Sequence, residues 1–196
     1  MYIFFDTETN GLPKNWSAPV TDIDNWPRLV EIAWMAYDDE GNELSRASYI
    51  IKPAGFEISM ESAEIHGISN EKALKEGVDL ETVLAEFAEI LNKTEKIVAH
   101  NIAFDENIVG AEFLRCGMEN IIPSITKICT MKETVDFCAI EGRYGYKWPT
   151  LRELYFTLFK RDFENAHNAL SDVKATAECF WELTKIVKSA KQLKLF

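Results

Sequence analysis

Two carboxylates follow directly on an apolar run near the start of the chain. The run beginning at Ile3 is typical of a buried strand, and Asp6 and Glu8 come at its end, two positions apart. Side chains two apart on a strand project from the same face, so these two carboxylates point the same way. Adjacent carboxylates repel each other unless a cation lies between them, and a hard divalent ion with oxygen ligands is the usual solution. The pair predicts a metal site, and a strand that simply ends in solvated acids is the alternative.

Two further acids fall where strands and helices are expected to meet. Asp105 comes shortly after an apolar strand, and Asp172 lies in the first turn of the last helix, five residues after His167. On a continuous helix those five residues would turn the two side chains about 140° apart, so they can share a site only if His167 precedes the helix. An imidazole in such a loop is suited to be the general base for a water beside metal ions. The alternative is that Asp172 caps the helix and His167 packs on a neighbour.

The elements that must position these residues alternate along the chain. Beyond the first strand, strands are expected over residues 29–37 and 43–52, which form a hairpin, and over 96–100 and 124–129. Helices are expected over 59–66, 69–76, 80–92 with Asp79 as N-cap, 101–115, 130–140, from Pro149 onward, and over 171–190. This order indicates an α/β layered domain with a mixed sheet, whose strand ends and following helices converge on one crevice. The four acids and the histidine are expected to meet there.

Two segments without regular structure contain aromatic residues. The long loop 13–28 holds Trp16 and Trp26, which either pin it to the body of the protein or stack on a base. The loop 141–148 contains Arg143, Tyr144, Tyr146, Lys147 and Trp148 from position 143 onward. It either binds bases and phosphates or secures the helix that follows.

Composition bounds the class of protein. The chain has 196 residues, of which 47% are hydrophobic, so we expect one globular domain over residues 1–190. A formal net charge of −11 argues against a protein that coats nucleic acid through a broad basic surface. It does not exclude a nucleic-acid enzyme, because clustered active-site acids contribute to that charge and bound divalent ions would offset them.

The cysteines and the N-terminus favour the cytoplasm. Cys116, Cys129, Cys138 and Cys179 are scattered without Cys-x-x-Cys spacing, which suits free thiols in a reducing compartment. The opening five residues lack a basic segment and are followed by acids, so we expect neither a signal peptide nor a membrane anchor. No apolar stretch reaches the length of a membrane span.

Taken together, three motifs resemble those of a known family. They are Asp6-x-Glu8, His100-Asn101-x-x-Phe104-Asp105 and His167-x-Ala169-x-x-Asp172. Their order and spacing resemble the histidine branch of the DEDD exonuclease superfamily, to which the proofreading subunit of bacterial DNA polymerase III and ribonuclease T belong. The resemblance implies a ribonuclease H-like, three-layer fold with a central mixed five-stranded sheet.

The same resemblance implies a mechanism and a set of roles. Asp6, Glu8, Asp105 and Asp172 would hold two divalent ions, Mg²⁺ or Mn²⁺, and His167 would be the base. The activity would be two-metal hydrolysis that releases nucleoside monophosphates from a 3′ end. We expect single-stranded DNA as substrate, in proofreading or repair. The alternatives are an RNA-trimming exonuclease of the same superfamily and a catalytically inactive adaptor bound to a sliding clamp.

Further residues are implied near the substrate. Thr7 and Thr9 would contact the terminal nucleotide, Leu12 would wedge against its base, Phe104 would line the pocket, and His66 would lie beside the 3′ nucleotide. The loop 13–28 is longer than is usual in the family, which leaves the substrate preference open.

The C-terminal tail, residues 191–196, resembles the pentapeptide with which bacterial replication proteins bind the sliding clamp. Its residues for that role would be Gln192, Leu193, Leu195 and Phe196. The amide would give a polar contact and the apolar side chains would fill a groove. The alternative is the frayed end of a helix. A sliding clamp or a replicative polymerase is therefore an expected partner.

Overall fold

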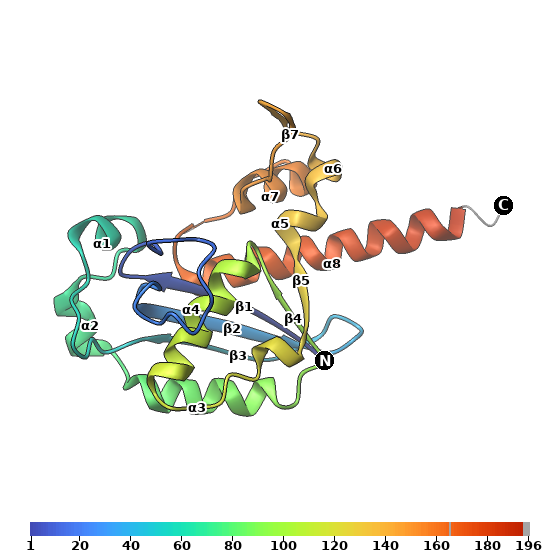
Figure 1. Cartoon of the computed structure of the whole chain (residues 1–196). Helices are drawn as coiled ribbons and strands as arrows, with labels where there is room; N and C mark the ends of the chain where they lie inside the picture. The colour runs from blue at the N-terminus through green and yellow to red at the C-terminus, as the bar shows by residue number, and fades with distance from the viewer. Residues whose placement is uncertain (165, 194–196) are drawn as a thin grey trace.

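The computed structural model describes residues 1–164 and 166–193 and has at its centre one mixed sheet of five strands (Figure 1). These are β1 (Tyr2–Thr9), β2 (Leu29–Tyr37), β3 (Glu43–Ile50), β4 (Lys96–Ala99) and β5 (Thr126–Cys129). Their spatial order is β3-β2-β1-β4-β5, with the first three antiparallel and β1, β4 and β5 parallel. The predicted three-layer, five-stranded mixed sheet is confirmed, and β1 lies at its centre, hydrogen-bonded on both sides.

Helices cover both faces of the sheet. They are α1 (Met60–His66), α2 (Asn70–Glu76), α3 (Leu80–Leu91), α4 (Ile102–Arg115), α5 (Thr130–Glu133), α6 (Val135–Cys138), α7 (Leu151–Phe159) and α8 (Ala169–Leu193), with a 3-10 turn η1 (Ile122–Ser124). On one face, Phe5 of β1 packs with Phe87 of α3 and Val109 of α4. On the other face, Phe4 packs with Val173 of α8. Alternate residues of β1 therefore look toward different helical layers.

Local signals set most of the boundaries. Ser59 and Ser69 cap α1 and α2, and each side-chain oxygen accepts a hydrogen bond from a backbone N–H in the first turn. Asp79 occupies the N-cap position of α3 as expected, but its side chain makes no capping hydrogen bond. Thr150, and not Pro149, begins α7, through a capping box with Glu153. The prediction of Pro149 as the first helical residue was therefore wrong.

The helix predicted over residues 130–140 is in fact two short helices. Thr134 separates α5 from α6 with a φ of −113°, and its hydroxyl donates to the carbonyl of Thr130 at 2.7 Å. The same hydroxyl-to-carbonyl bond occurs at Thr157 in α7 and at Thr184 in α8 without ending either helix, so the break lies in the backbone conformation of Thr134 and not in this bond. After α6 the chain forms a small hairpin of β6 (Glu141–Gly142) and β7 (Gly145–Tyr146).

The long loop 13–28 is fastened to α4 by a buried carboxylate. Glu112 is fully buried and accepts from the Arg28 Nε at 2.8 Å and from the backbone N–H of Leu29 at 2.9 Å. Arg115 pairs with the same carboxylate and donates to the carbonyl of Trp26 at 2.7 Å. The loop is thus ordered by charge pairing in the interior, without helix or strand of its own.

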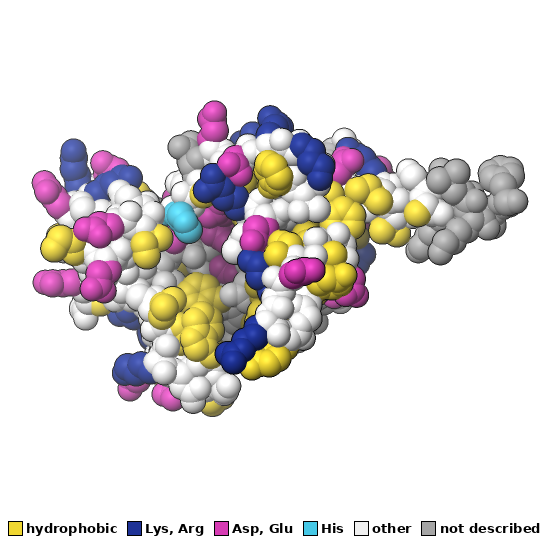
Figure 2. Space-filling model, turned by 90° about the horizontal axis from the view of Figure 1, so that it is seen from above, with side chains coloured by type: hydrophobic (Ala, Val, Ile, Leu, Met, Phe, Trp, Pro, Cys, Tyr) yellow, Lys and Arg dark blue, Asp and Glu magenta, His cyan; other side chains and the backbone are white. Residues whose placement is uncertain are grey.

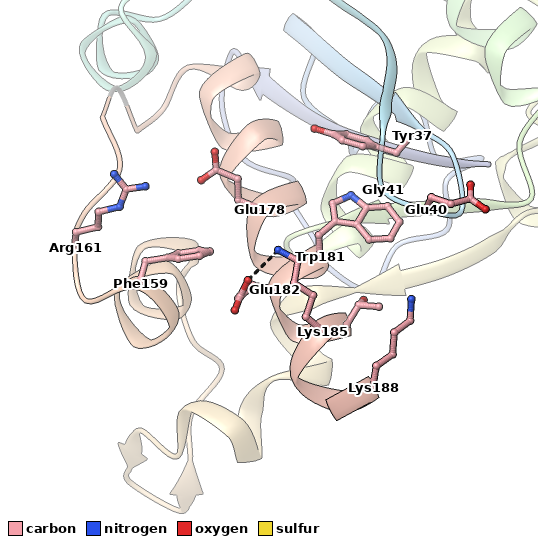
Figure 3. Close-up of a pocket in the computed structure, with 11 residues that line it drawn as sticks. Tyr37, Glu40, Gly41, Phe159, Arg161, Glu178, Trp181, Glu182, Lys185 and Lys188 are labelled. Atoms are coloured by element: carbon pink, nitrogen blue, oxygen red, sulfur yellow. Dashed lines mark hydrogen bonds and ion pairs between the residues drawn. The ribbon is translucent and has the colours of Figure 1, made fainter. Parts of the chain in front are cut away.

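A hollow lies at the end of the sheet that carries the β2–β3 turn (Figure 3). There the Trp181 ring of α8 lies under the β2–β3 turn, so close that a Cβ at Gly41 would stand 3.2 Å from it. The cavity beside it has a volume of about 430 Å³ and is lined by side chains of both signs, Arg161, Lys185 and Lys188 with Glu40, Glu178 and Glu182. The formal charges of the three basic and three acidic side chains balance.

Three further predictions concern the cysteines, membrane-spanning segments and the C-terminal tail. The four cysteines are free. Within residues 1–164 and 166–193, no helix is long and apolar enough to cross a membrane. The proposed clamp-binding side chains, those of Gln192, Leu193, Leu195 and Phe196, lie outside the side chains that the structure describes.

Candidate active site

The central strand brings the first two carboxylates to the face covered by α8. Asp6 and Glu8 share the side of β1 on which Phe4 meets Val173 of α8. They lie at the carboxyl end of the strand, and Glu8 stands directly opposite Glu31 of β2. The alternation seen in the sequence therefore delivers both acids to one place.

Asp105 reaches the same strand end from the other layer. It lies in the first turn of α4 and is 3% exposed. Thr7, on the opposite side of β1 from Asp6 and Glu8, donates to Asp105 Oδ1 from its backbone N–H at 3.0 Å and from its hydroxyl at 2.8 Å. Both donors of Thr7 are thus used to fix one carboxylate oxygen, which makes Thr7 a support for Asp105.

His167 precedes α8, where the spacing to Asp172 requires it to be. The imidazole is exposed, and the backbone has a φ of 68°, a left-handed conformation that is uncommon for a residue other than glycine. Its backbone N–H donates to Asp172 Oδ2 at 3.0 Å. Glu8, His167 and Asp172 each offer one atom such that all three atoms lie within 4.8 Å of one another, so an ion held by the two carboxylates would lie beside the imidazole.

A fifth carboxylate, which the sequence reasoning missed, holds the start of α8. Glu31 is 4% exposed and accepts from the backbone N–H of Ala169 at 3.2 Å and from the Asn168 amide at 3.4 Å. Ser48 of β3 donates to the same carboxylate at 3.1 Å. An anion beside the first N–H groups of a helix is favourable. The signal in the sequence was a single glutamate inside an otherwise apolar strand.

The site has a strong excess of negative charge. Burial first, and the neighbouring carboxylates second, raise the pKa of Asp6 well above its ordinary range. The same two causes raise the pKa of Glu8 to about 8. Burial raises the pKa of Asp105 to about 7 and that of Asp172 to about 6. Within the described ranges, no Lys or Arg side chain forms an ion pair with any of the four.

A hollow of about 540 Å³ adjoins the acids, between the end of β1, helix α1 and the start of α4. It contains all five residues expected near the substrate, Thr7, Thr9, Leu12, His66 and Phe104, together with Glu8. Seen from above, acidic side chains lie deep in the surface, with a histidine at the rim and hydrophobic side chains beside them (Figure 2). Leu12 is 72% exposed, so it is available for contact and is not a core residue.

Three residues at this hollow have defined partners. His66 is 8% exposed, and its Nδ1 accepts from the backbone N–H of Ile68 at 3.1 Å. The ring hydrogen of neutral His66 is therefore on Nε2, which lies buried beside the backbone of Thr9. Thr9 donates its hydroxyl to the carbonyl of Gly11 at 2.7 Å. Phe104 packs against the Trp16 ring, with centroids 5.7 Å apart.

The two tryptophans of the loop 13–28 have different surroundings. Trp26 is 4% exposed and donates from Nε1 to the carbonyl of Pro19 at 3.2 Å. Trp16 is 57% exposed beside Phe104, at the edge of the hollow. Packing accounts for Trp26, whereas Trp16 is open to solvent.

A mixed sheet in the order β3-β2-β1-β4-β5, with four carboxylates and a histidine gathered at one end of its central strand, defines the class of DEDD-type 3′→5′ exonucleases. Comparison with family models agrees, since the model of the RNase_T family, described as exonuclease, matches residues 3–180. The chain belongs to this exonuclease family, and the predicted family is confirmed.

Curated relatives and solved structures extend the comparison. The chain is 28% identical over 186 residues to the PolC-type DNA polymerase III of Streptococcus sanguinis and 25% identical over 179 residues to that of Pediococcus pentosaceus. These matches cover 95% and 89% of this chain but 11% of each relative. It also shares its fold with E. coli exonuclease I bound to single-stranded DNA, with a TM-score of 0.73 and 19% identity over 97% of this chain and 41% of that one. The complex of exonuclease I with a dT13 oligonucleotide gives a TM-score of 0.74 at 20% identity, over 94% and 40% of the two chains.

Proposed function

We propose that this chain hydrolyses single-stranded DNA from its 3′ end to nucleoside monophosphates, with two divalent ions, Mg²⁺ or Mn²⁺, as cofactors. The observation that carries the proposal is the cluster of Asp6, Glu8, Asp105 and Asp172, whose raised pKa values reflect burial and mutual repulsion. A protein that buries four acids together without a basic partner bears a cost that bound cations would remove.

The donor set fits hard divalent cations. All four candidate ligands are carboxylates, which are the ligands that Mg²⁺ and Mn²⁺ prefer. Asp6, Glu8 and Asp172, with His167 beside them, would hold one ion, and Asp6 and Asp105 would hold the second. Ions bound there would supply an activated water and neutralise charge on the attacking and leaving oxygens.

The chain's own residues supply the proton transfer and the positioning. His167 is the proposed base, because its exposed imidazole is free to meet a water at the acid cluster. His66, which lines the hollow, is proposed to lie beside the 3′ nucleotide, and Leu12 and Phe104 offer apolar surface for the base of that nucleotide. Thr7 acts indirectly, by orienting Asp105.

Single-stranded DNA is the proposed polymer because E. coli exonuclease I, which shares the fold, was solved with single-stranded DNA. The chain spans about a tenth of the length of its PolC-type relatives. We propose that it acts either in proofreading beside a polymerase or in free-standing repair. A replicative polymerase and a sliding clamp are the proposed partners, and the cytoplasm is the proposed location.

A ladder assay tests the proposal. Matched 5′-labelled single strands of DNA and RNA are incubated with wild type, Asp6→Ala and Glu95→Ala in Mg²⁺, Mn²⁺ or EDTA. Glu95 is an exposed acid just before β4, so its variant controls for the loss of one charge. We expect metal-dependent shortening from the 3′ end in wild type and Glu95→Ala, and a loss of at least about a thousandfold in Asp6→Ala. Faster loss of RNA would identify a ribonuclease, and no ladder on either polymer would favour the inactive adaptor.

A further inference from the structure

The β6–β7 hairpin exposes aromatic side chains that the catalytic centre does not use. Its two-residue turn is Arg143–Tyr144, between the paired residues Gly142 and Gly145. Tyr144 is 89% exposed, Tyr146 54% and Trp148 61%. The guanidinium of Arg143 lies 5.2 Å from the centroid of the Tyr144 ring, so cation and ring are presented together at the tip. Three aromatic side chains exposed within five residues place more apolar surface in water than is usual for a surface that binds no partner.

The base of the hairpin is fixed to the sheet near the acids. His100 follows β4 directly, and its Nε2 donates to the carbonyl of Pro149 at 3.0 Å. The other ring nitrogen, Nδ1, bonds to the hydroxyl of Thr130 at 3.0 Å. The backbone N–H of Lys147 donates to the carbonyl of Ile140 at 2.9 Å and closes the base of the hairpin. These contacts join the hairpin to the strand end that leads to Asp105.

The hairpin stands on the side to which the hollow opens. Figure 1 shows it rising above the ends of β4 and β5, next to α7. Figure 2 views the same side and shows the acids recessed below a rim that carries Lys, Arg and hydrophobic side chains. A strand whose 3′ end lies in the hollow and whose 5′ part leaves toward solvent can therefore meet the hairpin.

The charge around the hairpin differs from that of the whole protein. Residues 141–162, which include the whole hairpin, contain five Lys or Arg and three Asp or Glu, whereas the chain has a net charge of −11. Lys147 and Arg152 are paired, with Glu153 at 2.6 Å and Asp162 at 2.7 Å respectively. Within the described part of the chain, Arg143 forms no ion pair, so its charge is available to a phosphate.

We propose that the β6–β7 hairpin is a second nucleic-acid contact, which binds nucleotides upstream of the 3′ end through stacking on Tyr144 and a phosphate contact from Arg143. Stacking on an exposed ring tolerates any base, and an adjacent cation adds the backbone contact that a single strand needs. The inference rests on the proposed function and adds a length dependence to it. The competing occupant, a protein partner, is an outcome of the test below.

The test separates the hairpin from the catalytic centre by the size of the substrate. The variants are Arg143→Ala/Tyr144→Ala, the conservative Tyr144→Phe, and a control, Leu44→Ala/Arg46→Ala. The control removes one exposed apolar side chain and one positive charge from β3, at the opposite edge of the sheet. Activity is measured on the p-nitrophenyl ester of thymidine 5′-monophosphate and on single-stranded DNA of about 20 nucleotides. Affinity for that DNA is measured by fluorescence anisotropy in an Asp6→Asn background.

We expect the hairpin double variant to raise KM and Kd for the long strand by about five- to a hundredfold. The rate of the double variant on the small ester should equal that of the wild type. The KM and Kd of Tyr144→Phe and of the control for the long strand should also equal those of the wild type. If the hairpin double variant binds the long strand with wild-type affinity, the nucleic-acid contact is refuted. A protein partner would then be the proposed occupant of this surface. Equal losses on the ester and the long strand would also refute the contact, because the damage would then lie in the catalytic centre. If wild-type protein hydrolyses neither substrate, the proposed function fails, while the anisotropy still decides the binding.

Discussion

The two halves of the candidate site are held in different ways. The strand half, Asp6, Glu8 and Asp105, belongs to the centre of the sheet and to a helix that packs on it, and its deepest member is 3% exposed. The helix half, His167 and Asp172, stands at the edge of α8 and depends on a few hydrogen bonds. The difference teaches that groups that must hold fixed charge are built into the interior, whereas the proposed base is left on an exposed backbone turn.

The largest effects on kcat are expected when His167 or Asp172 is removed. The two variants should differ in their effect on metal affinity. His167→Ala should lower kcat by about a hundred- to ten-thousandfold and leave metal affinity unchanged, because only the base is lost. Asp172→Ala should lower both, because it removes a proposed ligand and the acceptor of the His167 N–H. Isothermal titration with Mn²⁺ and single-turnover kinetics measure the two properties. Equal loss of metal affinity in the two variants would contradict the division.

The acids of both halves should make the metal-free protein sensitive to pH. The carboxylic acids of Glu8, Asp105 and Asp172 have pKa values of about 8, 7 and 6, above those of about 4 in an unfolded chain. The folded state therefore binds more protons than the unfolded state between about pH 4 and 8, so the stability that is fully present below about pH 4 is lost as pH rises through the folded-state pKa values of about 6 to 8. In EDTA, Tm should fall over this interval.

A matched variant isolates that effect from the histidines. Asp6→Asn removes one of the repelling charges, so its Tm in EDTA at pH 8 should exceed that of the wild type by several degrees, and the difference should shrink toward pH 5. Mn²⁺ should raise the Tm of the wild type more than that of Asp6→Asn. A wild-type Tm that stays level between pH 6 and 8 in EDTA would show that the acids are not in repulsion.

Glu31 tests how the helix half is supported. Glu31→Ala leaves the Ala169 N–H and the Asn168 amide without their buried acceptor, so kcat should fall about tenfold and stability by about 2 kcal/mol. Glu31→Gln keeps one oxygen for the Ala169 N–H and should recover most of the rate. Ser48→Ala removes the third donor to the same carboxylate and controls for the loss of one hydrogen bond. A normal kcat in Glu31→Ala would mean that α8 keeps its position without this carboxylate.

The smallest effect is expected for Thr7→Val within the strand half. The substitution removes the hydroxyl that donates to Asp105 at 2.8 Å and keeps both the shape and the backbone donor at 3.0 Å. Stability should fall by about 1 kcal/mol and kcat by only a few-fold, because one donor to the same oxygen remains. Denaturant unfolding and steady-state kinetics measure the two. A loss as large as that of His167→Ala would show that Thr7 takes a direct part in the reaction.

Local patterns predicted the strand half of the site better than its supports. The spacing of Asp6 and Glu8 fixes their common side through strand alternation alone. The five-residue interval before Asp172 was enough to place His167 ahead of the helix. Glu31 could not be assigned a role in this way, because its hydrogen bonds reach residues 137 and 138 positions away. The break at Thr134 lies in its backbone conformation, with a φ of −113°, which a pattern of apolar residues does not record.

The order of the strands bears on the order in which the parts of the candidate site form during synthesis. The meander β1-β2-β3, which carries Asp6 and Glu8, is made of neighbours along the chain and can pair as soon as it leaves the ribosome. Asp105 is made after this meander, and His167 and Asp172 are made later again. A nascent chain therefore holds the first acids before the proposed base. With His167 as that base, hydrolysis would begin only once α8 has docked on the sheet.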